Sequence, residues 1–305
     1  MAMTPYPDGN DAFENPSLRG SNNGFKWEVP SFLPDPVIPQ PDNADQHYSD
    51  PHILLKDGEL HLFYRLTDKI RNRSFIFWTR SKDLVKWALP ILVYEGGWCL
   101  SPSVIFEENV WFMWFVDLVK DNKSTISTLK MVKGVTPEAF DNEVSCVVDL
   151  GKFHPWHIEV KKVDGNFQGL INAFPGTSES IGQSLFLVKS LNGYDWNRSD
   201  AVSILKPSYL GWDNKLIYKA SFLSTEEGSY RIWYSACSWG GKWYIGYIEG
   251  ALNSIKRISI QPALELNRVL KVKQDLNGIF RIGLRRFLPV YVFNLTKKLY
   301  NFLVS

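Results

Sequence analysis

The amino-acid sequence predicts an all-β protein, a β-propeller of four or five sheets with a basic helical extension at its C-terminus. Three observations predict it. Short apolar and aromatic runs recur at close spacing, a turn signature repeats at a regular interval, and helical periodicity is confined to the end of the chain. We therefore divide the 305 residues into a propeller, residues 1–265, and a tail, residues 266–305.

The predicted strands are short runs of apolar and aromatic residues between turn residues, which is typical of an all-β chain. Asp57-Gly58 and Asp164-Gly165 predict tight turns between neighbouring strands. The predicted strands are His52–Leu55, Leu60–Tyr64, Ser74–Trp78, Val104–Phe106, Trp111–Val116, Leu185–Val188, Arg231–Tyr234 and Trp243–Ile248.

A turn signature, Ser-x-(Asn/Asp)-x-x-x-Trp, occurs at residues 21–27, 81–87 and 190–196. The copies start 81 − 21 = 60 and 190 − 81 = 109 residues apart, one period and about two. We expect the Ser and Asn/Asp side chains to cap the turn and the Trp to cover the outer strand. A two-sheet sandwich would not repeat a turn signature in this way, so the repeat favours a propeller.

A proline element begins each repeating unit, in Glu14-Asn-Pro16, Ser49-Asp-Pro51, Leu100-Ser-Pro102 and Phe153-His-Pro155. Each precedes a predicted innermost strand, and innermost strands of a propeller converge on its axis. We therefore expect Glu14, Asp50, Ser101 and His154 to gather around one pocket.

Composition excludes several classes of protein. The net charge of +2 argues against nucleic-acid binding. Three widely spaced cysteines exclude a disulfide scaffold and a thiolate zinc site. Without a signal-peptide pattern in residues 1–25 or a long apolar run, we expect a cytoplasmic protein. The glycosylation sequons therefore carry little weight; they begin at Asn72, Asn122, Asn197 and Asn294.

The tail carries a strong positive charge. Residues 268–305 hold eight Lys and Arg against Asp275, a charge of +7, which leaves −5 for the rest of the chain. Apolar residues at helical spacing before and after Pro289 predict two short amphipathic helices. Two interpretations stay open: the helices pack on the propeller, or they attach it to the inner face of the membrane through anionic lipid.

The motif Ser49-Asp-Pro-His-Ile, with Asp57-Gly58, Phe63-Tyr-Arg65 and the turn at residues 81–87, resembles the five-bladed β-propeller of glycoside hydrolase family 43 and its relatives. The resemblance covers roughly residues 10–260 and implies five blades. In that family an Asp acts as general base, a second Asp orients the acid, and a Glu is the acid. The resemblance places Asp50 on the base, Ser101 on the second Asp and His154 on the acid.

Two of these three carboxylates are therefore replaced, so the resemblance implies the fold more than the hydrolytic reaction. Glu159 and Glu14 are the alternative acids. Glu159 follows His157 on one face of the same strand, and Glu14 lies in the matching element one blade earlier.

Other side chains complete the candidate site. Arg65 could bind a phosphate or carboxylate, or pair with a neighbouring acid. Lys219 lies in an apolar strand, where burial would require a partner. His154 and His157 flank Trp156, which suits acid–base chemistry and stacking on a sugar. The further candidates are Trp114 and Trp212 for stacking on a sugar and Asp117 at the end of an equivalent strand. The sequence has no metal-binding cluster or phosphate loop, so we expect no cofactor.

Three functions fit these observations. The first is a glycosyltransferase of cell-surface polysaccharide assembly at the membrane, in which Asp50 activates an acceptor hydroxyl. There His154, Arg65 or Lys219 would offset the phosphate charge of a nucleotide-sugar or lipid-linked donor. The second is a glycoside hydrolase that uses Asp50 with Glu159 or Glu14. The third is a non-catalytic carbohydrate-binding propeller.

Overall fold

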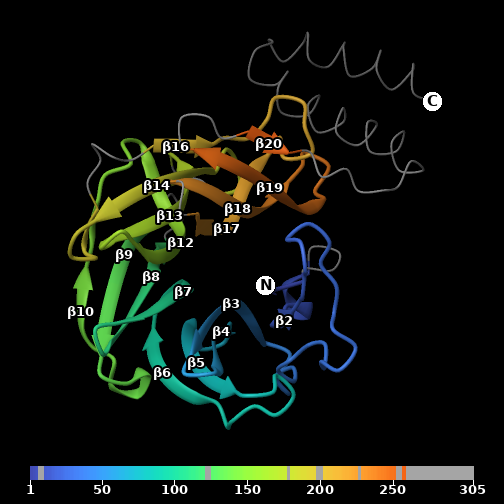
Figure 1. The fold of residues 1–305 in the computed structure, drawn as a ribbon, viewed down its shortest axis with the longest axis vertical. Coiled ribbons are helices and arrows are strands. Elements are labelled where there is room, and N and C mark those ends of the chain that lie inside the picture. The colour runs from blue at the N-terminus through green and yellow to red at the C-terminus, as the bar shows by residue number, and fades with distance from the viewer. Residues whose placement is uncertain are drawn as a thin grey trace.

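A computed structural model describes residues 1–5, 10–120, 125–176, 179–196, 202–225, 228–251 and 256–258. These residues form four four-stranded antiparallel sheets around a common centre (Figure 1). The helical structure among them consists of two single 3-10 turns, η2 (Asp11–Phe13) and η3 (Pro137–Ala139). The predicted all-β propeller is confirmed.

Each sheet is a meander in which consecutive strands pair from the centre outward. The first sheet contains β3 (Gln46–Lys56), β4 (Glu59–Asp68), β5 (Arg73–Ser81) and β6 (Ile91–Gly96). The second contains β7 (Trp98–Glu107), β8 (Val110–Lys120), β9 (Thr125–Gly134) and β10 (Asp141–Ser145). The third contains β12 (Phe153–Val163), β13 (Asn166–Pro175), β14 (Ser184–Ser190) and β16 (Val202–Leu205), and the fourth β17 (Leu216–Ser224), β18 (Ser229–Cys237), β19 (Trp243–Ala251) and β20 (Lys256–Ile258). A short parallel pair, β11 (Val147–Val148) with β15 (Asp195–Trp196), joins the second and third sheets.

The expectation of five four-stranded blades is wrong for the described residues. The place of a fifth blade, between the first and fourth sheets, is taken by the N-terminal segment (Figure 1). The β-structure in the described residues of that segment consists of the two-stranded sheet of β1 (Ala2–Met3) and β2 (Ser17–Leu18) and one isolated bridge. Five prolines between residues 30 and 41 explain the difference, because proline has no N–H to donate to a strand ladder.

Contacts from the N-terminal segment to the fourth sheet close the ring. Trp233 Nε1 donates a hydrogen bond to the Gly24 carbonyl at 2.6 Å. The Phe25 ring packs edge-on against Tyr247, with centroids 4.8 Å apart. The two ends of the propeller are therefore joined by side chains rather than by a shared four-stranded blade.

The predicted strands and turns agree with the structure, and all eight predicted runs lie within strands. Asp57 and Gly58 have φ of 51° and 75°, and Asp164 and Gly165 have φ of 48° and 75°. Two consecutive left-handed residues define the turn that best matches the twist of a β-hairpin. Asp-Gly supplies both at low cost, which is why these turns could be predicted.

The repeated turn signature caps its turn as predicted. In all three copies the Ser hydroxyl accepts the backbone N–H three residues on, at 2.8–2.9 Å. The side-chain oxygen of the Asn or Asp accepts the backbone N–H groups of the residues two and three positions after it. In the first two copies Trp27 and Trp87 close the turn by donating back to a carbonyl. In the third, Trp114 donates to that carbonyl, of Gly193, while Trp196 is buried.

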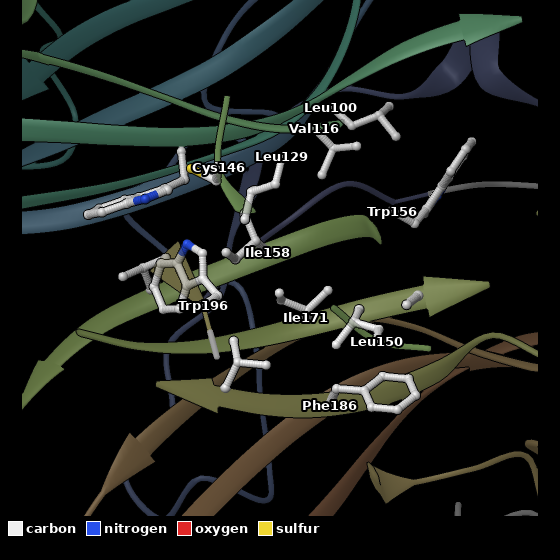
Figure 2. Packing of buried hydrophobic residues seen from close by; sticks show 14 of the residues in the cluster. Leu100, Val116, Leu129, Cys146, Leu150, Trp156, Ile158, Ile171, Phe186 and Trp196 are labelled. Atoms are coloured by element: carbon white, nitrogen blue, oxygen red, sulfur yellow. The ribbon is translucent and has the colours of Figure 1, made fainter. Parts of the chain in front are cut away.

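A large hydrophobic cluster fills the space between the second and third sheets. Figure 2 shows Leu100, Val116 and Leu129 of the second sheet facing Ile158, Ile171 and Phe186 of the third. Burying such side chains stabilises the packing of blade on blade by about 25 cal/mol per Å² of apolar surface. The innermost strands are thereby held in fixed positions around the axis.

We expect Gly193→Ala to destabilise the protein by about 1–3 kcal/mol more than Gly165→Ala. Both glycines have positive φ, so both variants carry the same backbone strain. A Cβ at Gly193 would lie 2.9 Å from Trp114 Cζ2, whereas a Cβ at Gly165 would meet nothing within 4 Å. Urea unfolding of the two variants measures the difference, and equal losses would contradict the packing described here.

The predicted tail, residues 266–305, lies outside the described residues. Its helices, its membrane contact and the cytoplasmic location therefore stay predictions. No helix among the described residues is long and apolar enough to cross a membrane. The cysteines Cys99, Cys146 and Cys237 are buried, and none of them is in a disulfide.

Candidate functional site

Each innermost strand contains a β-bulge near its N-terminal end. The register shifts between Ser49 and His52 in β3, and between Leu100 and Ser103 in β7. It shifts again after Pro155 in β12 and after Ile217 in β17. These strands contact one another in the order β3, β7, β12, β17. Because a bulge re-aims the side chains of its strand, four bulges around one axis bring together residues that are distant in the sequence.

Asp50 and Ser101 occupy equivalent bulges. They have φ of 51° and 50°, left-handed values that are costly for non-glycine residues, and each precedes a proline. The Ser101 N–H donates to Asp50 Oδ2 at 3.3 Å. The predicted convergence of the strand heads of β3 and β7 is therefore confirmed for these two residues.

Asp50 lies between two cations. Arg65 Nε is 3.3 Å from Asp50 Oδ2, and Lys219 Nζ is 3.9 Å from Oδ1. Burial works to raise the pKa of Asp50, but the charges of Arg65 and then Lys219 hold this pKa well below its usual range. Asp50 is thus an ionised carboxylate at any ordinary pH. Of the interpretations offered for Arg65, pairing with a neighbouring acid is the one observed.

Arg65 is held in place by its own hydrogen bonds. It lies on β4, directly opposite Ser49 of β3. Its Nε and Nη2 donate to Ser49 Oγ at 3.0 and 2.8 Å, and its Nη1 donates to the Cys99 carbonyl at 3.1 Å. All three nitrogens are engaged, so Arg65 acts on Asp50 as a fixed charge.

His157 lies on the third side of the site. Ser101 Oγ is hydrogen-bonded to His157 Nδ1, whereas His157 Nε2 has no partner. Burial lowers the pKa of His157 to about 3, so its ring is neutral. The Tyr218 ring packs edge-on against it at 4.4 Å, and the Tyr218 hydroxyl accepts a hydrogen bond from Trp156 Nε1 at 3.2 Å. Tyr218 was missed from the sequence, although it lies beside Lys219 at an equivalent strand head.

Glu14 joins the site from the N-terminal segment, directly after η2. Its Oε2 lies 3.6 Å from Nε2 of His47 on β3. Burial raises the pKa of Glu14 to about 7, against the opposing charge of Arg65 and with the help of Asp50. Burial also lowers the pKa of His47 to about 4, so near neutral pH the proton of this pair resides on Glu14. His47 was also missed; its two-residue spacing from Ser49, on one face of the strand, was the available signal.

Glu159 belongs to a neighbouring ion cluster, whose charge also acts on Lys219. His52 Nδ1 lies 3.3 Å from it, Lys161 Nζ lies 3.3 Å away, and the Ser221 hydroxyl donates to it at 3.1 Å. Burial favours a higher pKa for Glu159, but Lys161 and His52 hold this pKa below its usual range. A fully paired, ionised carboxylate cannot serve as a general acid, so the geometry does not support that role for Glu159.

His154 does not line the site. It is exposed, and its ring lies 5.4 Å from that of Phe174. The bulge of β12 follows Pro155, so the strand turns His157 rather than His154 toward Ser101 and Asp50. The matching of proline elements predicted His154 at this position, whereas His157, three residues later, lies beside Ser101.

The predicted stacking platform is not supported by the structure. Trp114 is fully buried in the core, and Trp156 is only 7% exposed within the same cluster. Trp212 stacks on Tyr234. Asp117 is paired with Lys130 at 2.9 Å. Within the described part of the chain, no cluster of three or more His, Cys, Asp or Glu side chains could hold a metal ion.

Comparisons with known proteins support the fold. No family model matches the chain. In sequence it is similar to an A type blood N-acetyl-α-D-galactosamine deacetylase of Flavonifractor plautii, with 23% identity over 73% of this chain. The alignment covers 36% of that protein, so the chain spans about a third of the length of the curated relative it matches.

Solved structures give the same result. An N-acetylgalactosamine deacetylase from F. plautii, crystallised with blood group B trisaccharide, superposes with a TM-score of 0.73 and 21% identity over 82% of this chain and 84% of that chain. An α-L-arabinofuranosidase from Lactobacillus brevis superposes with a TM-score of 0.54 and 14% identity, over 72% of this chain and 75% of that chain. A β-fructofuranosidase of Bombyx mori superposes with a TM-score of 0.53 and 15% identity, over 70% of this chain and 49% of that chain. At these identities the likeness establishes the propeller fold.

Proposed function

We propose that this protein is a carbohydrate-active hydrolase of the glycoside hydrolase type, with Asp50 as the base or nucleophile and Glu14 as the general acid. One observation carries the proposal. Two carboxylates share a site in which their environments move their pKa values in opposite directions, the pKa of Glu14 up to about 7 and that of Asp50 downward. Such a divided pair is how enzymes assign acid and base roles to similar side chains.

The chemistry follows from the two protonation states. Near neutral pH about half of Glu14 carries a proton, which it can deliver to the leaving oxygen of a glycosidic bond. Asp50 stays ionised beside Arg65 and Lys219, and it can take a proton from water or attack the sugar directly. Each group holds its required form at the same pH.

Glycosyl transfer, the first function considered from the sequence, has no comparable support. Arg65 and Lys219, which were expected to face a donor phosphate, both face Asp50. The basic tail that suggested a membrane substrate lies outside the described residues. The names of two fold neighbours, an arabinofuranosidase and a fructofuranosidase, favour hydrolysis.

A second candidate function is hydrolysis of the acetamido group of an amino sugar. The observation favouring it is that the similar curated protein and the structure superposing at a TM-score of 0.73 are both N-acetylgalactosamine deacetylases. The same residues suit it: Asp50 would activate water toward the amide carbonyl, and Glu14 would protonate the departing amine.

Two product assays on one panel test both candidates. The purified protein is incubated with aryl glycosides and with oligosaccharides that contain N-acetylated sugars, and the release of reducing sugar and of acetate is measured. Release of a sugar supports the main proposal, and release of acetate alone supports the second. Turnover that requires a nucleotide-sugar, or no product from any substrate, would contradict both.

A further inference from the structure

Two buried nitrogen atoms beside Asp50 lack hydrogen-bond partners, Lys219 Nζ and His157 Nε2. Buried polar atoms are normally paired, because an unpaired one has lost its water without gaining a partner. Both belong to side chains at the bulges around the axis. Together they indicate that an atom supplied by a ligand completes their hydrogen bonding.

Lys219 is the available cation of the site. Its Nζ lies 3.9 Å from Asp50 Oδ1, an ion pair that is too long for a hydrogen bond. Arg65, on the other side of Asp50, has its nitrogens engaged by Ser49 and the Cys99 carbonyl. Arg65 thus already uses three of its five N–H donors, whereas the ammonium group of Lys219 makes no hydrogen bond and can offer its donors to an incoming group.

His157 can contribute a second donor. Ser101 Oγ occupies its Nδ1, and the neutral ring carries one proton. When the Ser101 hydroxyl donates to Nδ1, that proton is on Nε2. The Tyr218 ring, 4.4 Å away, fixes the orientation of the imidazole.

The charges around the site favour an acceptor oxygen. Asp50 is balanced by Arg65, and Glu159, which also acts on Lys219, is balanced by Lys161. Lys219 therefore leaves one positive charge when Glu14 is protonated. A carbonyl or carboxylate oxygen can accept two N–H donors at once and brings no proton that needs an acceptor of its own. A hydroxyl meets the first condition but not the second.

We infer that the sugar bound at this site carries an exocyclic carbonyl oxygen, from a carboxylate or an acetamido group, and that Lys219 Nζ and His157 Nε2 bind that oxygen. The inference rests on the proposed function for the carbohydrate nature of the ligand. It adds the substituent that distinguishes the substrate from a neutral, unsubstituted sugar.

Isothermal titration calorimetry tests the inference with two series of sugars. The first is galactose, galacturonic acid and N-acetylgalactosamine, and the second is glucose, glucuronic acid and N-acetylglucosamine. A hydrogen bond to a charged donor contributes about 1.5–3 kcal/mol, so one carbonyl-bearing sugar should bind about tenfold or more tightly than its parent. A preference for the acid that weakens with salt identifies a carboxylate, and a salt-independent preference for the N-acetyl sugar identifies an acetamido group.

Variants assign the preference to Lys219. Lys219→Met should remove it, and Lys219→Arg should restore it in part. Lys130→Met, which removes a cation paired with Asp117 and Glu143 rather than with Asp50, should leave it unchanged. Thermal unfolding of each variant checks that it is folded.

Equal affinity for the three sugars of each series, a preference that survives in Lys219→Met, or no binding of any of them would overturn the inference. Binding requires no turnover, so the two proposals fail separately. A carbonyl preference without hydrolysis would contradict only the proposed function, and hydrolysis without the preference would contradict only this inference.

Discussion

Replacing Asp50 by Asn is expected to reduce kcat/KM by ~10⁴-fold on the best substrate of the panel. The amide keeps the shape of the side chain and its contact with the Ser101 N–H, but it cannot accept a proton from water or attack a sugar. Arg65 and Lys219 also lose the charge that they share. Steady-state kinetics, on protein shown by near-UV circular dichroism to be folded, measures the loss.

Asp117→Asn is the matched control. Asp117 lies on β8 at the end of an equivalent strand and is paired with Lys130 at 2.9 Å. Its loss should leave kcat/KM unchanged. If Asp50→Asn kept more than about a tenth of the wild-type rate, Asp50 could not be the base or nucleophile.

Replacing Glu14 by Gln is expected to lower kcat/KM by ~10²–10⁴-fold and to change the pH dependence of kcat/KM. In the wild-type protein kcat/KM should fall as the pH rises through about 7, because Glu14 must carry a proton to act as the acid. Gln cannot donate that proton, so this alkaline limb should be absent from the variant. The pH–rate profiles of the two proteins make the comparison.

Glu95→Gln provides the control for Glu14. Glu95 is an exposed carboxylate on β6, paired with Arg73 at 2.9 Å, and its variant should keep the wild-type profile. An alkaline limb that persists with the same midpoint in Glu14→Gln would assign it to another group and remove Glu14 from the mechanism.

The sheets could be predicted from the sequence because their signals are local. Asp57-Gly58 adopts the left-handed pair that its residue types favour, and the Ser-x-(Asn/Asp) signature caps its turn through bonds within four residues. The sequence also indicated that the fifth blade is missing, through the five prolines between residues 30 and 41. The N-terminal segment was interpreted as a blade because of the family resemblance, although proline cannot donate the hydrogen bonds that a strand requires.

The site could be predicted only in part, because its geometry depends on pairing between strands. Asp50 and Glu14 were found from the proline elements, and Lys219 from the cost of burying an amine. The exchange of His154 for His157 depends on the position of one bulge in β12, which is set by pairing with β13. The burial of Trp114 depends on packing against the neighbouring sheet. The sequence alone does not distinguish a tryptophan buried in this way from one that binds a sugar.

The central claim is that Glu14 and Asp50 form one electrostatically coupled pair, although they come from distant segments. The most direct test is a titration of Glu14 by carbon-13 NMR in protein labelled at glutamate, with Glu14→Gln used to assign the signal. We predict a midpoint near 7 in the wild-type protein and a lower one in Asp50→Asn, where the neighbouring negative charge is gone. A midpoint in the ordinary carboxyl range, unchanged by Asp50→Asn, would show that the two carboxylates do not share a site.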